Sequence, residues 1–347
     1  MKEQLIKHSI NQLIVTEPKS LQYYSDIKLD PQERFLALLI EPETNSYVFA
    51  NALFLLKDSD QYRVIEHYDY QDPIASLRPY LKGPVVGLDR WMRAEFVLKL
   101  QESFPDITFV DGSDIIEGLQ TIKSADAIEK MKQASRLNDL VMKQIKSEIK
   151  VGISERDLEQ RILQLFEEVG ADGPSFEPIV AFGENAADPH AQVSDRLLKA
   201  NESIILDFGC IKDGYCSDMT RTYFLGENSM KQVYDTVLQA QTAALKAIVP
   251  GARFCDIDKA ARDVIEAAGY GKYFIHRLGH GIGQSVHEPF DVSSANPRQI
   301  QPGMCFSLEP GIYLEGIGGI RIEDLVYVDD QGFPVLLNHV SKTEEII

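Results

Sequence analysis

The sequence predicts an α/β protein (α+β in its second part) of two domains, and three observations lead to this prediction. The chain has 347 residues, about twice the length of an ordinary domain. Short apolar runs alternate with helix-like stretches up to about residue 122. Beyond that point, two pairs of amphipathic helices recur at a constant spacing, and apolar strands follow each pair.

The first predicted domain spans residues 1–122. A helix is expected over residues 92–103, because Phe104-Pro105-Asp106 interrupts the helical pattern there. Alternation of strands and helices over this length is typical of an α/β domain. Strands are expected at four apolar runs bounded by turn residues: 13–15, 35–40, 46–49 and 85–88.

The second predicted domain spans residues 123–347 and begins with a pair of helices. Ser124 can cap a long helix whose apolar stripe continues to Val151-Gly152. A second helix is expected from Ser154, and Gly170 ends it. Both helices carry one apolar stripe, so we expect each to cover a sheet.

The same helix pair recurs 99 residues later, which indicates an internal duplication. Gly152, Asp157 and Gly170 have counterparts at this offset in Gly251, Asp256 and Gly269. Strands are expected after each pair, at 179–182, 204–208 and 220–224 and then at 305–308 and 320–323. We therefore predict two helix-and-sheet halves related by a pseudo-twofold axis.

Composition excludes several classes of partner. Acidic residues number 53 and basic residues 35, and the net charge of −18 repels the phosphates of nucleic acids. No apolar run approaches the roughly 18 residues of a membrane helix, and the charged N-terminus does not resemble a signal peptide. The four cysteines form no C-x-x-C pair and are interpreted as reduced thiols. We expect a cytoplasmic protein that binds neither nucleic acid nor membranes.

Four carboxylates lie within or beside the apolar strands of the second domain: Asp207, Asp218, Glu309 and Glu323. A carboxylate in a buried strand is costly unless a cation or strong donors meet it. One such acid would be interpreted as an arginine partner or a turn cap. One acid on each strand of two symmetric hairpins instead favours metal ions. Four carboxylates with few nitrogen ligands suit Mn²⁺, Co²⁺ or Zn²⁺ and are enough for two ions.

Three histidines are candidates for the same site. His280 lies between glycines, which let the backbone approach closely, and we predict that it binds metal. His287 follows it by seven residues, as His190 follows Gly183, and both are predicted to contact substrate or transition state. His276 stays undecided between a structural and a functional role. His8, His67 and His339 are interpreted as structural.

Three further side chains could support the site. Arg321 lies two residues before Glu323, so both would point to one face of a strand, where Arg321 could fix the carboxylate or bind substrate. Thr220 shares a strand face with Asp218 in the same way and is a candidate donor behind it. Tyr313 follows Glu309 by four residues.

The ordered set Asp207, Asp218, His280, Glu309 and Glu323 resembles that of the metallopeptidases that include methionine aminopeptidase, Xaa-Pro aminopeptidase and prolidase. The resemblance covers residues from about 124 to 347 and implies the pita-bread fold. The N-terminal part resembles the creatinase-like domain of the proline-specific branch. The loop Lys28-Leu29-Asp30-Pro31-Gln32-Glu33-Arg34 and the short gap from Glu309 to Glu323 are similar to bacterial prolidases. Gln32 departs from relatives that carry a histidine in this loop.

The resemblance implies a role for each candidate. Asp207 would bind one metal ion, His280 and Glu309 the other, and Asp218 and Glu323 would bridge them. A water activated by both ions would attack the carbonyl before proline, and Glu309 would shuttle the proton. His190 and His287 would stabilise the oxyanion and hold substrate. Arg321 and Tyr313 would contact substrate and support the site.

The implied function is hydrolysis of Xaa-Pro dipeptides, with two divalent ions as cofactors and Mn²⁺ expected before Co²⁺ or Zn²⁺. One alternative is an Xaa-Pro aminopeptidase that acts on longer peptides with proline in second position. A remote alternative is a non-catalytic binding protein on the same fold. The resemblance also implies a homodimer, with residues 1–122 serving dimerisation and substrate access.

Overall fold

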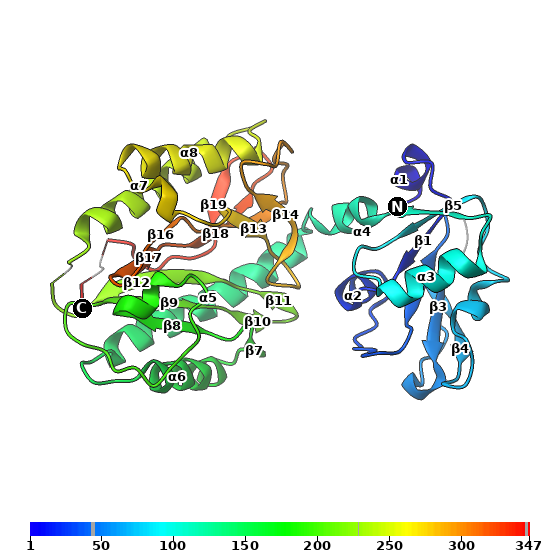
Figure 1. Cartoon of the computed structure of the whole chain (residues 1–347), viewed down its shortest axis with the longest axis horizontal. Coiled ribbons are helices and arrows are strands. Elements are labelled where there is room, and N and C mark those ends of the chain that lie inside the picture. The colour runs from blue at the N-terminus through cyan, green and yellow to red at the C-terminus, as the bar shows by residue number, and fades with distance from the viewer. Residues whose placement is uncertain (43–45, 228, 344–345) are drawn as a thin grey trace. The chain divides into compact units, whose positions relative to one another are not determined.

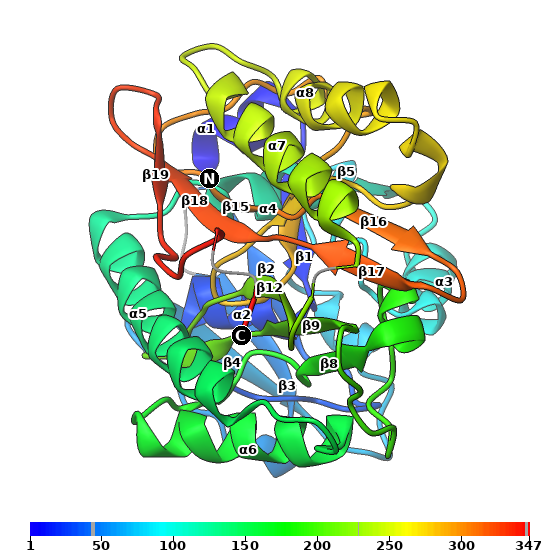
Figure 2. The same ribbon diagram turned by 90° about the vertical axis from the view of Figure 1, so that its left-hand side faces the viewer.

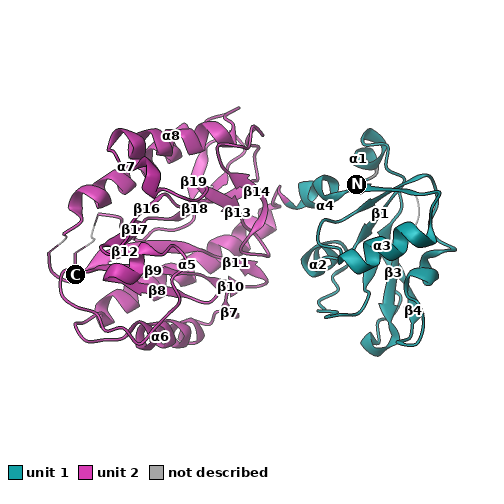
Figure 3. Ribbon diagram, viewed as in Figure 1, with its two compact units in different colours: residues 1–120 teal, residues 121–347 magenta. Residues whose placement is uncertain are grey.

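The computed structural model describes residues 1–42, 46–227, 229–343 and 346–347. It divides into two compact units, residues 1–120 and residues 121–347, which are drawn in teal and magenta in Figure 3. None of the described helices combines the length and the hydrophobicity that crossing a lipid bilayer requires.

The first unit is built on a mixed six-stranded sheet of order β4-β3-β2-β1-β5-β6 (Figure 1). β1 pairs antiparallel with β2 and parallel with β5, so the sheet changes direction at its centre. Strands lie at all four predicted runs, whereas β4 and β6 were not predicted because their short sequences carry polar residues at half of the positions. The strands are β1 (Gln12–Val15), β2 (Ala37–Ile40), β3 (Ser46–Asn51), β4 (Tyr62–His67), β5 (Val85–Leu88) and β6 (Thr108–Asp111).

Helices cover both faces of this sheet. Side chains of β1 alternate between two hydrophobic clusters, with Leu13 and Val15 in one and Ile14 in the other. The first cluster includes residues of α2 and α4, and the second includes residues of α3. The helices are α1 (Lys2–Lys7), α2 (Pro18–Ser25), α3 (Ala94–Ser103) and α4 (Ser113–Gln120).

The second unit contains the predicted duplication. Its helices are α5 (Ala125–Glu148), α6 (Glu155–Glu168), α7 (Lys231–Ala247) and α8 (Phe254–Ala267), so α6 and α8 start 99 residues apart and have equal length. The paired glycines 152 and 251, and 170 and 269, all have φ between 77° and 87°, a region that favours glycine. Ser124 and Ser154 cap α5 and α6 through their hydroxyls, as expected. α5 ends at Glu148 rather than Val151, because Ile149 is already extended.

The strands of this unit lie between the two helix pairs. Figure 2 shows α7 and α8 above the strands, α6 below them and α5 along their left side. One sheet has the order β12-β9-β8 and another the order β14-β13-β15-β18-β19. These strands are β8 (Ile179–Phe182), β9 (Ser203–Phe208), β12 (Met219–Phe224), β13 (Gly279–Gly281), β14 (Glu288–Val292), β15 (Cys305–Leu308), β18 (Asp324–Val328) and β19 (Pro334–Leu336). The smaller sheets contain β7 (Gly173–Pro174), β10 (Cys210–Lys212) and β11 (Tyr215–Cys216), and β16 (Gly311–Leu314) and β17 (Gly318–Arg321).

The prediction of one strand over residues 320–323 is wrong. β17 ends at Arg321 and β18 begins at Asp324, so Ile322 and Glu323 lie between two strands of different sheets. The backbone N–H of Glu323 donates to the carbonyl of Thr220 in β12, at 3.1 Å. This hydrogen bond between the two halves takes the place of the interstrand hydrogen bonds that a continuous strand would have made.

Candidate metal centre

A cavity of about 870 Å³ lies between the two halves of the second unit. All five residues predicted as metal ligands line it, and so do both histidines predicted to contact substrate and Arg321. Tyr313 is not among the residues that line it. Its apolar lining consists of Phe176, Ile179, Pro189, Ile275 and Val286.

Strand pairing accounts for the position of the four carboxylates. β9 and β12 pair antiparallel with Asp207 opposite Thr220, and Asp218 immediately precedes β12. β15 and β18 pair antiparallel with Leu308 opposite Asp324. Glu309 directly follows Leu308, and Glu323 directly precedes Asp324, so both acids lie at the same end of this strand pair. Each half therefore brings its two acids to one end of one strand pair.

The ligand atoms of Asp218, His280 and Glu323 all lie within 4.8 Å of one another, as a divalent ion requires. Nε2 of His280 is 3.7 Å from Oδ2 of Asp218 and 3.4 Å from Oε1 of Glu309. Asp207 lies outside this close set, and its Oδ2 accepts from Arg321 at 2.6 Å.

Three carboxylate oxygens in the cavity are buried without a hydrogen-bond partner among the described residues. They are Oδ1 of Asp207, Oδ1 of Asp218 and Oε1 of Glu323. An unsatisfied buried acceptor costs about 1–3 kcal/mol, and more when it is charged. Divalent cations would satisfy all three oxygens, so these residues fit a metal centre.

The imidazole of His280 is held in the form that binds metal. Its Nδ1 lies 3.1 Å from the carbonyl of Gly281 and donates to it, which leaves the Nε2 lone pair facing the acids. Burial and the neighbouring His287 lower the pKa of His280 to about 3, so the ring is neutral. Gly279 is required beside it, because a Cβ there would lie 2.0 Å from the carbonyl oxygen of Ser307.

The four acids repel one another in the metal-free protein. Burial raises the pKa of Glu309 from 4.5 to about 7, and the charge of Asp207 adds to this rise. Burial and the neighbouring carboxylates also raise the pKa values of Asp218 and Glu323 well above their ordinary range. Cations at the centre would reverse these shifts by favouring the ionised form.

We expect metal-free protein to lose stability as the pH rises from about 4.5 towards 7. The folded state holds protons on these acids at pH values where the unfolded chain has released them. For Glu309 this contribution is complete below pH 4.5 and disappears as the pH passes its folded pKa of about 7. The slope is about 1.4 kcal/mol per pH unit for each such group.

The measurement is the midpoint of thermal unfolding at pH 5 and pH 7.5, with chelator and with excess Mn²⁺. Titration of surface groups affects the metal-free and the Mn²⁺-loaded protein equally, so it drops out of the difference between their unfolding midpoints. We expect this difference to grow with pH. A difference that is equal at both pH values would contradict the proposed mutual repulsion.

Arg321 donates hydrogen bonds to several neighbouring protein groups. It donates to Asp207 at 2.6 Å, to the Thr220 hydroxyl at 3.1 Å and to the Tyr313 hydroxyl at 2.9 Å. A further bond reaches the carbonyl of Pro189, at 3.2 Å. Arg321 therefore orients a carboxylate, but that of Asp207 and not that of Glu323 as predicted, because the strand breaks between Arg321 and Glu323.

His276, which the sequence left undecided, belongs to the same network. Its Nδ1 donates to the carbonyl of Arg277 at 2.7 Å, so its Nε2 accepts from the Tyr313 hydroxyl at 2.9 Å. Burial lowers the pKa of His276 to about 4, which keeps it a neutral acceptor. No spacing in the sequence indicated this role, because Tyr313 lies 37 residues away.

His190 and His287 differ from His276 in that both are exposed in the cavity wall. The ring of His287 meets that of His280 edge to face, with centroids 4.2 Å apart. Partial burial and the charge of Arg277 lower the pKa of His287. Both histidines are therefore placed to reach a ligand in the cavity.

The segment that carries His190 is held by a residue that sequence reasoning missed. Glu155, the first residue of α6, is fully buried. Its carboxylate accepts from the backbone N–H groups of Phe182 and Ser194, at 2.9 Å and 3.1 Å. It also accepts from the Asn185 amide, at 3.0 Å, and from the Ser194 hydroxyl. Glu155 thus closes the loop of residues 183–194.

We expect Glu155→Ala to lower the free energy of unfolding by about 3 kcal/mol, because it leaves several buried donors without an acceptor. The loop would loosen, so KM for peptides would rise as well. Far-UV circular dichroism during urea unfolding measures the loss, since the single tryptophan, Trp91, lies in the first unit. Glu167→Ala, an exposed change on the same helix, should stay within about 0.5 kcal/mol of the original. Equal stability of the two variants would contradict the role of Glu155.

A duplicated helix-and-sheet unit with convergent acids and a neutral histidine defines a metal-dependent hydrolase site. The chain belongs to metallopeptidase family M24, whose model matches residues 129–330. The Creatinase/Prolidase N-terminal domain matches residues 1–122. The protein is therefore a peptidase, and peptidases of this family use divalent metal ions.

The relatives agree with this assignment. An uncharacterized peptidase of Staphylococcus aureus (strain MSSA476) is 37% identical over 330 residues, which is 94% of each chain. The solved dipeptidase of Pyrococcus horikoshii OT3 has a TM-score of 0.90 and 35% identity, and the match covers 100% of this chain and 98% of that one. The recombinant prolidase of Thermococcus sibiricus has a TM-score of 0.91 and 33% identity, with 99% and 96% covered. The two solved structures, which are a dipeptidase and a prolidase, thus agree with membership of the metallopeptidase family.

Proposed function

We propose that the protein hydrolyses Xaa-Pro dipeptides with two divalent cations bound in the cavity of the second unit. The observation that carries this proposal is the set of three buried carboxylate oxygens that have no hydrogen-bond partner in the described part of the chain and lie beside a neutral histidine. Asp207 would hold one cation, His280 and Glu309 the other, and Asp218 and Glu323 both. Cations held there supply Lewis acidity, which brings the pKa of water towards neutrality and polarises a peptide carbonyl.

The side chains around this centre move protons and hold the substrate. Glu309 accepts the proton of the attacking water and delivers it to the ring nitrogen of the leaving proline. The hydroxyl of Ser307 donates to its Oε1 at 3.2 Å and orients the carboxylate. His190 and His287 donate to the oxyanion and to the substrate from the exposed wall.

Proline in second position agrees with the chemistry of the cavity. The Xaa-Pro bond has no N–H, so a site that reads this bond needs ring contacts instead of an acceptor. Phe176, Ile179 and Val286 offer an apolar wall for the ring. Arg277 also lines the cavity, and although its Nη1 pairs with Asp291, its other guanidinium N–H groups could bind the carboxylate that ends a dipeptide.

The remaining expectations are part of this proposal. We propose Mn²⁺ as the ion in use, with Co²⁺ or Zn²⁺ as alternatives for an oxygen-rich site with one imidazole. We also propose a homodimer in which residues 1–122 contribute to dimerisation and substrate access. A cytoplasmic location is proposed because Cys210, Cys216, Cys255 and Cys305 are free thiols.

The test is an assay of protein reconstituted with each metal on Leu-Pro, Leu-Pro-Gly and Leu-Ala, with a chelator control. Cleavage of Leu-Pro alone, lost with chelator, is the expected result. Cleavage mainly of Leu-Pro-Gly would instead establish the alternative, an Xaa-Pro aminopeptidase. Cleavage of none of the three by metal-loaded protein would overturn the proline specificity.

A further inference from the structure

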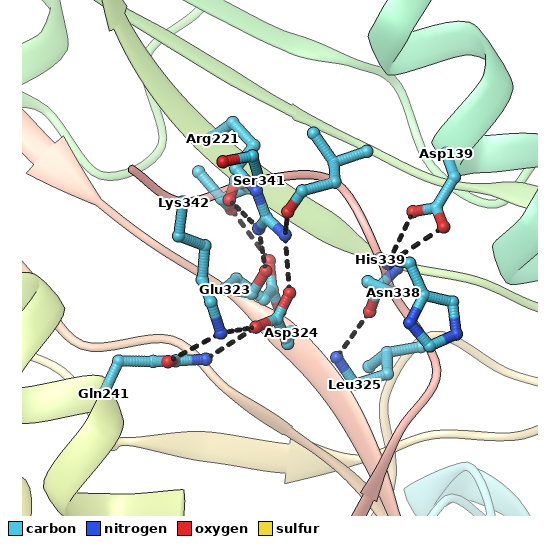
Figure 4. A network of polar contacts seen from close by, with 12 residues as sticks. Asp139, Arg221, Gln241, Glu323, Asp324, Leu325, Asn338, His339, Ser341 and Lys342 are labelled. Atoms are coloured by element: carbon cyan, nitrogen blue, oxygen red, sulfur yellow. Dashed lines mark hydrogen bonds and ion pairs between the residues drawn. The ribbon is translucent and has the colours of Figure 1, made fainter. Parts of the chain in front are cut away.

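A buried ion network adjoins the candidate metal centre and takes no part in the chemistry proposed above (Figure 4). Arg221 in β12 is 1% exposed and Asp324 in β18 is fully buried, and their side chains pair at 2.7 Å. Lys342 near the C-terminus also donates to Asp324. Two cations thus flank one carboxylate within the protein core.

The guanidinium of Arg221 joins three segments of the chain. Its Nη1 donates to the carbonyls of Thr220 and Glu323, at 2.9 Å and 2.6 Å. Its Nη2 donates to Asp324 and to the carbonyl of Val340, which is 2.9 Å away. One side chain therefore connects β12, the start of β18 and the C-terminal segment.

Residues 338–342 complete the network from the other side. Asn338 accepts from the backbone N–H of Leu325 at 2.7 Å, and Asp139 of α5 accepts from the backbone N–H of His339 at 2.9 Å. Gln241 of α7 donates to Asp324 at 2.8 Å and accepts from Lys342 at 3.1 Å. We refer to residues 338–342 together with Arg221 and Asp324 as the C-terminal clamp.

The backbone of Glu323 depends on β12 and this clamp because the residue lies in the break between β17 and β18. Its N–H donates to the Thr220 carbonyl, and its own carbonyl accepts from Arg221. The Thr220 hydroxyl also donates to Oε2 of the Glu323 side chain, at 2.8 Å. Thr220 of β12 thus holds the backbone N–H of Glu323, and Arg221 holds its carbonyl. Glu323 lines the cavity, and its Oε1 has no hydrogen-bond partner among the described residues.

We propose that the C-terminal clamp positions Glu323 and thereby sets the metal affinity of the centre. Arg221, Asp324 and Lys342 are positioning residues, because they act through the backbone of a ligand and do not line the cavity. This inference rests on the proposed metal centre and goes beyond it. The C-terminal segment becomes a determinant of metal loading although no residue of it contacts the site.

The test replaces Lys342 by methionine, which keeps length and apolar volume but cannot donate to Asp324. Mn²⁺ affinity of chelator-treated protein is measured by isothermal titration. Of the two proposed Mn²⁺ sites, we expect the weaker one to lose about tenfold in affinity. Removing a group that supports a metal ligand has an effect of this size. Activity should fall at limiting Mn²⁺ and return at saturating Mn²⁺.

Three further proteins complete the comparison. Lys342→Arg keeps a donor and should restore the affinity. Lys246→Met makes the same chemical change at an exposed position of α7, the helix of Gln241, and should leave the affinity unchanged. Arg221→Lys keeps the charge but loses the fork, so it should weaken binding more than Lys342→Met does.

Unchanged Mn²⁺ affinity in Lys342→Met and Arg221→Lys, with equal loss of thermal stability in metal-free and loaded protein, would overturn the clamp proposal. The clamp would then stabilise the fold without positioning a ligand. Failure of the original protein to bind Mn²⁺ would overturn the metal centre and the clamp together. Failure only to cleave Leu-Pro would overturn the proposed substrate and leave the clamp supported by its metal affinities.

Discussion

Asp218→Asn is expected to abolish peptidase activity and to make the metal-free protein more stable than the original. The amide preserves the shape of a buried side chain whose carboxylate lies among three other acids. An amide cannot ionise, so the variant avoids the cost of burying this charge or of keeping the acid protonated, which raises the free energy of unfolding without metal. It also removes a group that both cations share, so kcat/KM should fall by more than about 1,000-fold.

The measurements are initial rates on Leu-Pro with saturating Mn²⁺ and thermal unfolding with chelator. Asp330→Asn, an exposed change in the same unit, should alter neither. A variant at Asp218 that is inactive and also less stable would indicate structural damage. Full activity in Asp218→Asn would remove Asp218 from the metal centre.

His287→Ala is expected to lower kcat/KM by about 100-fold, the usual effect of losing one donor to an oxyanion. The exposed ring contacts His280 edge to face and does not contribute a predicted metal ligand. Mn²⁺ affinity should therefore stay close to that of the original protein, and the loss should appear in kcat. Steady-state kinetics and metal titration on the same preparation separate these effects.

His8→Ala supplies the matched control, because His8 is exposed in the first unit. Its kinetics should be unchanged. If His287→Ala weakens Mn²⁺ binding as strongly as it lowers kcat, the residue acts on the metal and not on the oxyanion. Activity within twofold of the original would exclude both roles.

The sequence allowed the duplicated unit to be predicted for identifiable physical reasons. Gly170 and Gly269 directly follow the C-caps of α6 and α8 in a backbone conformation that other residues adopt rarely, so the repeat leaves a trace in residue type. Acids such as Asp207 are conspicuous in the sequence because a charge inside an apolar strand is costly to bury. This can be recognised without knowing the fold. Local rules of this kind apply one residue at a time.

The features that were missed depend on contacts between distant segments. The break before Asp324 arises because Glu323 bonds to Thr220 in the other half, and the apolar pattern continues through it. Glu155 begins a helix like any capping acid, yet its partners lie up to 39 residues away. Arg221 bonds to Val340 across 119 residues. Periodicity carries no information on such pairs, and a single sequence does not reveal them.

Titration of chelator-treated protein with Mn²⁺, with Leu-Pro hydrolysis followed at each step, tests the proposed dinuclear centre. We expect no activity without metal and a rise that saturates at two ions bound per chain. Asp218→Asn should stay inactive throughout the titration. Undiminished hydrolysis by protein shown to contain no metal would contradict the proposed dinuclear centre.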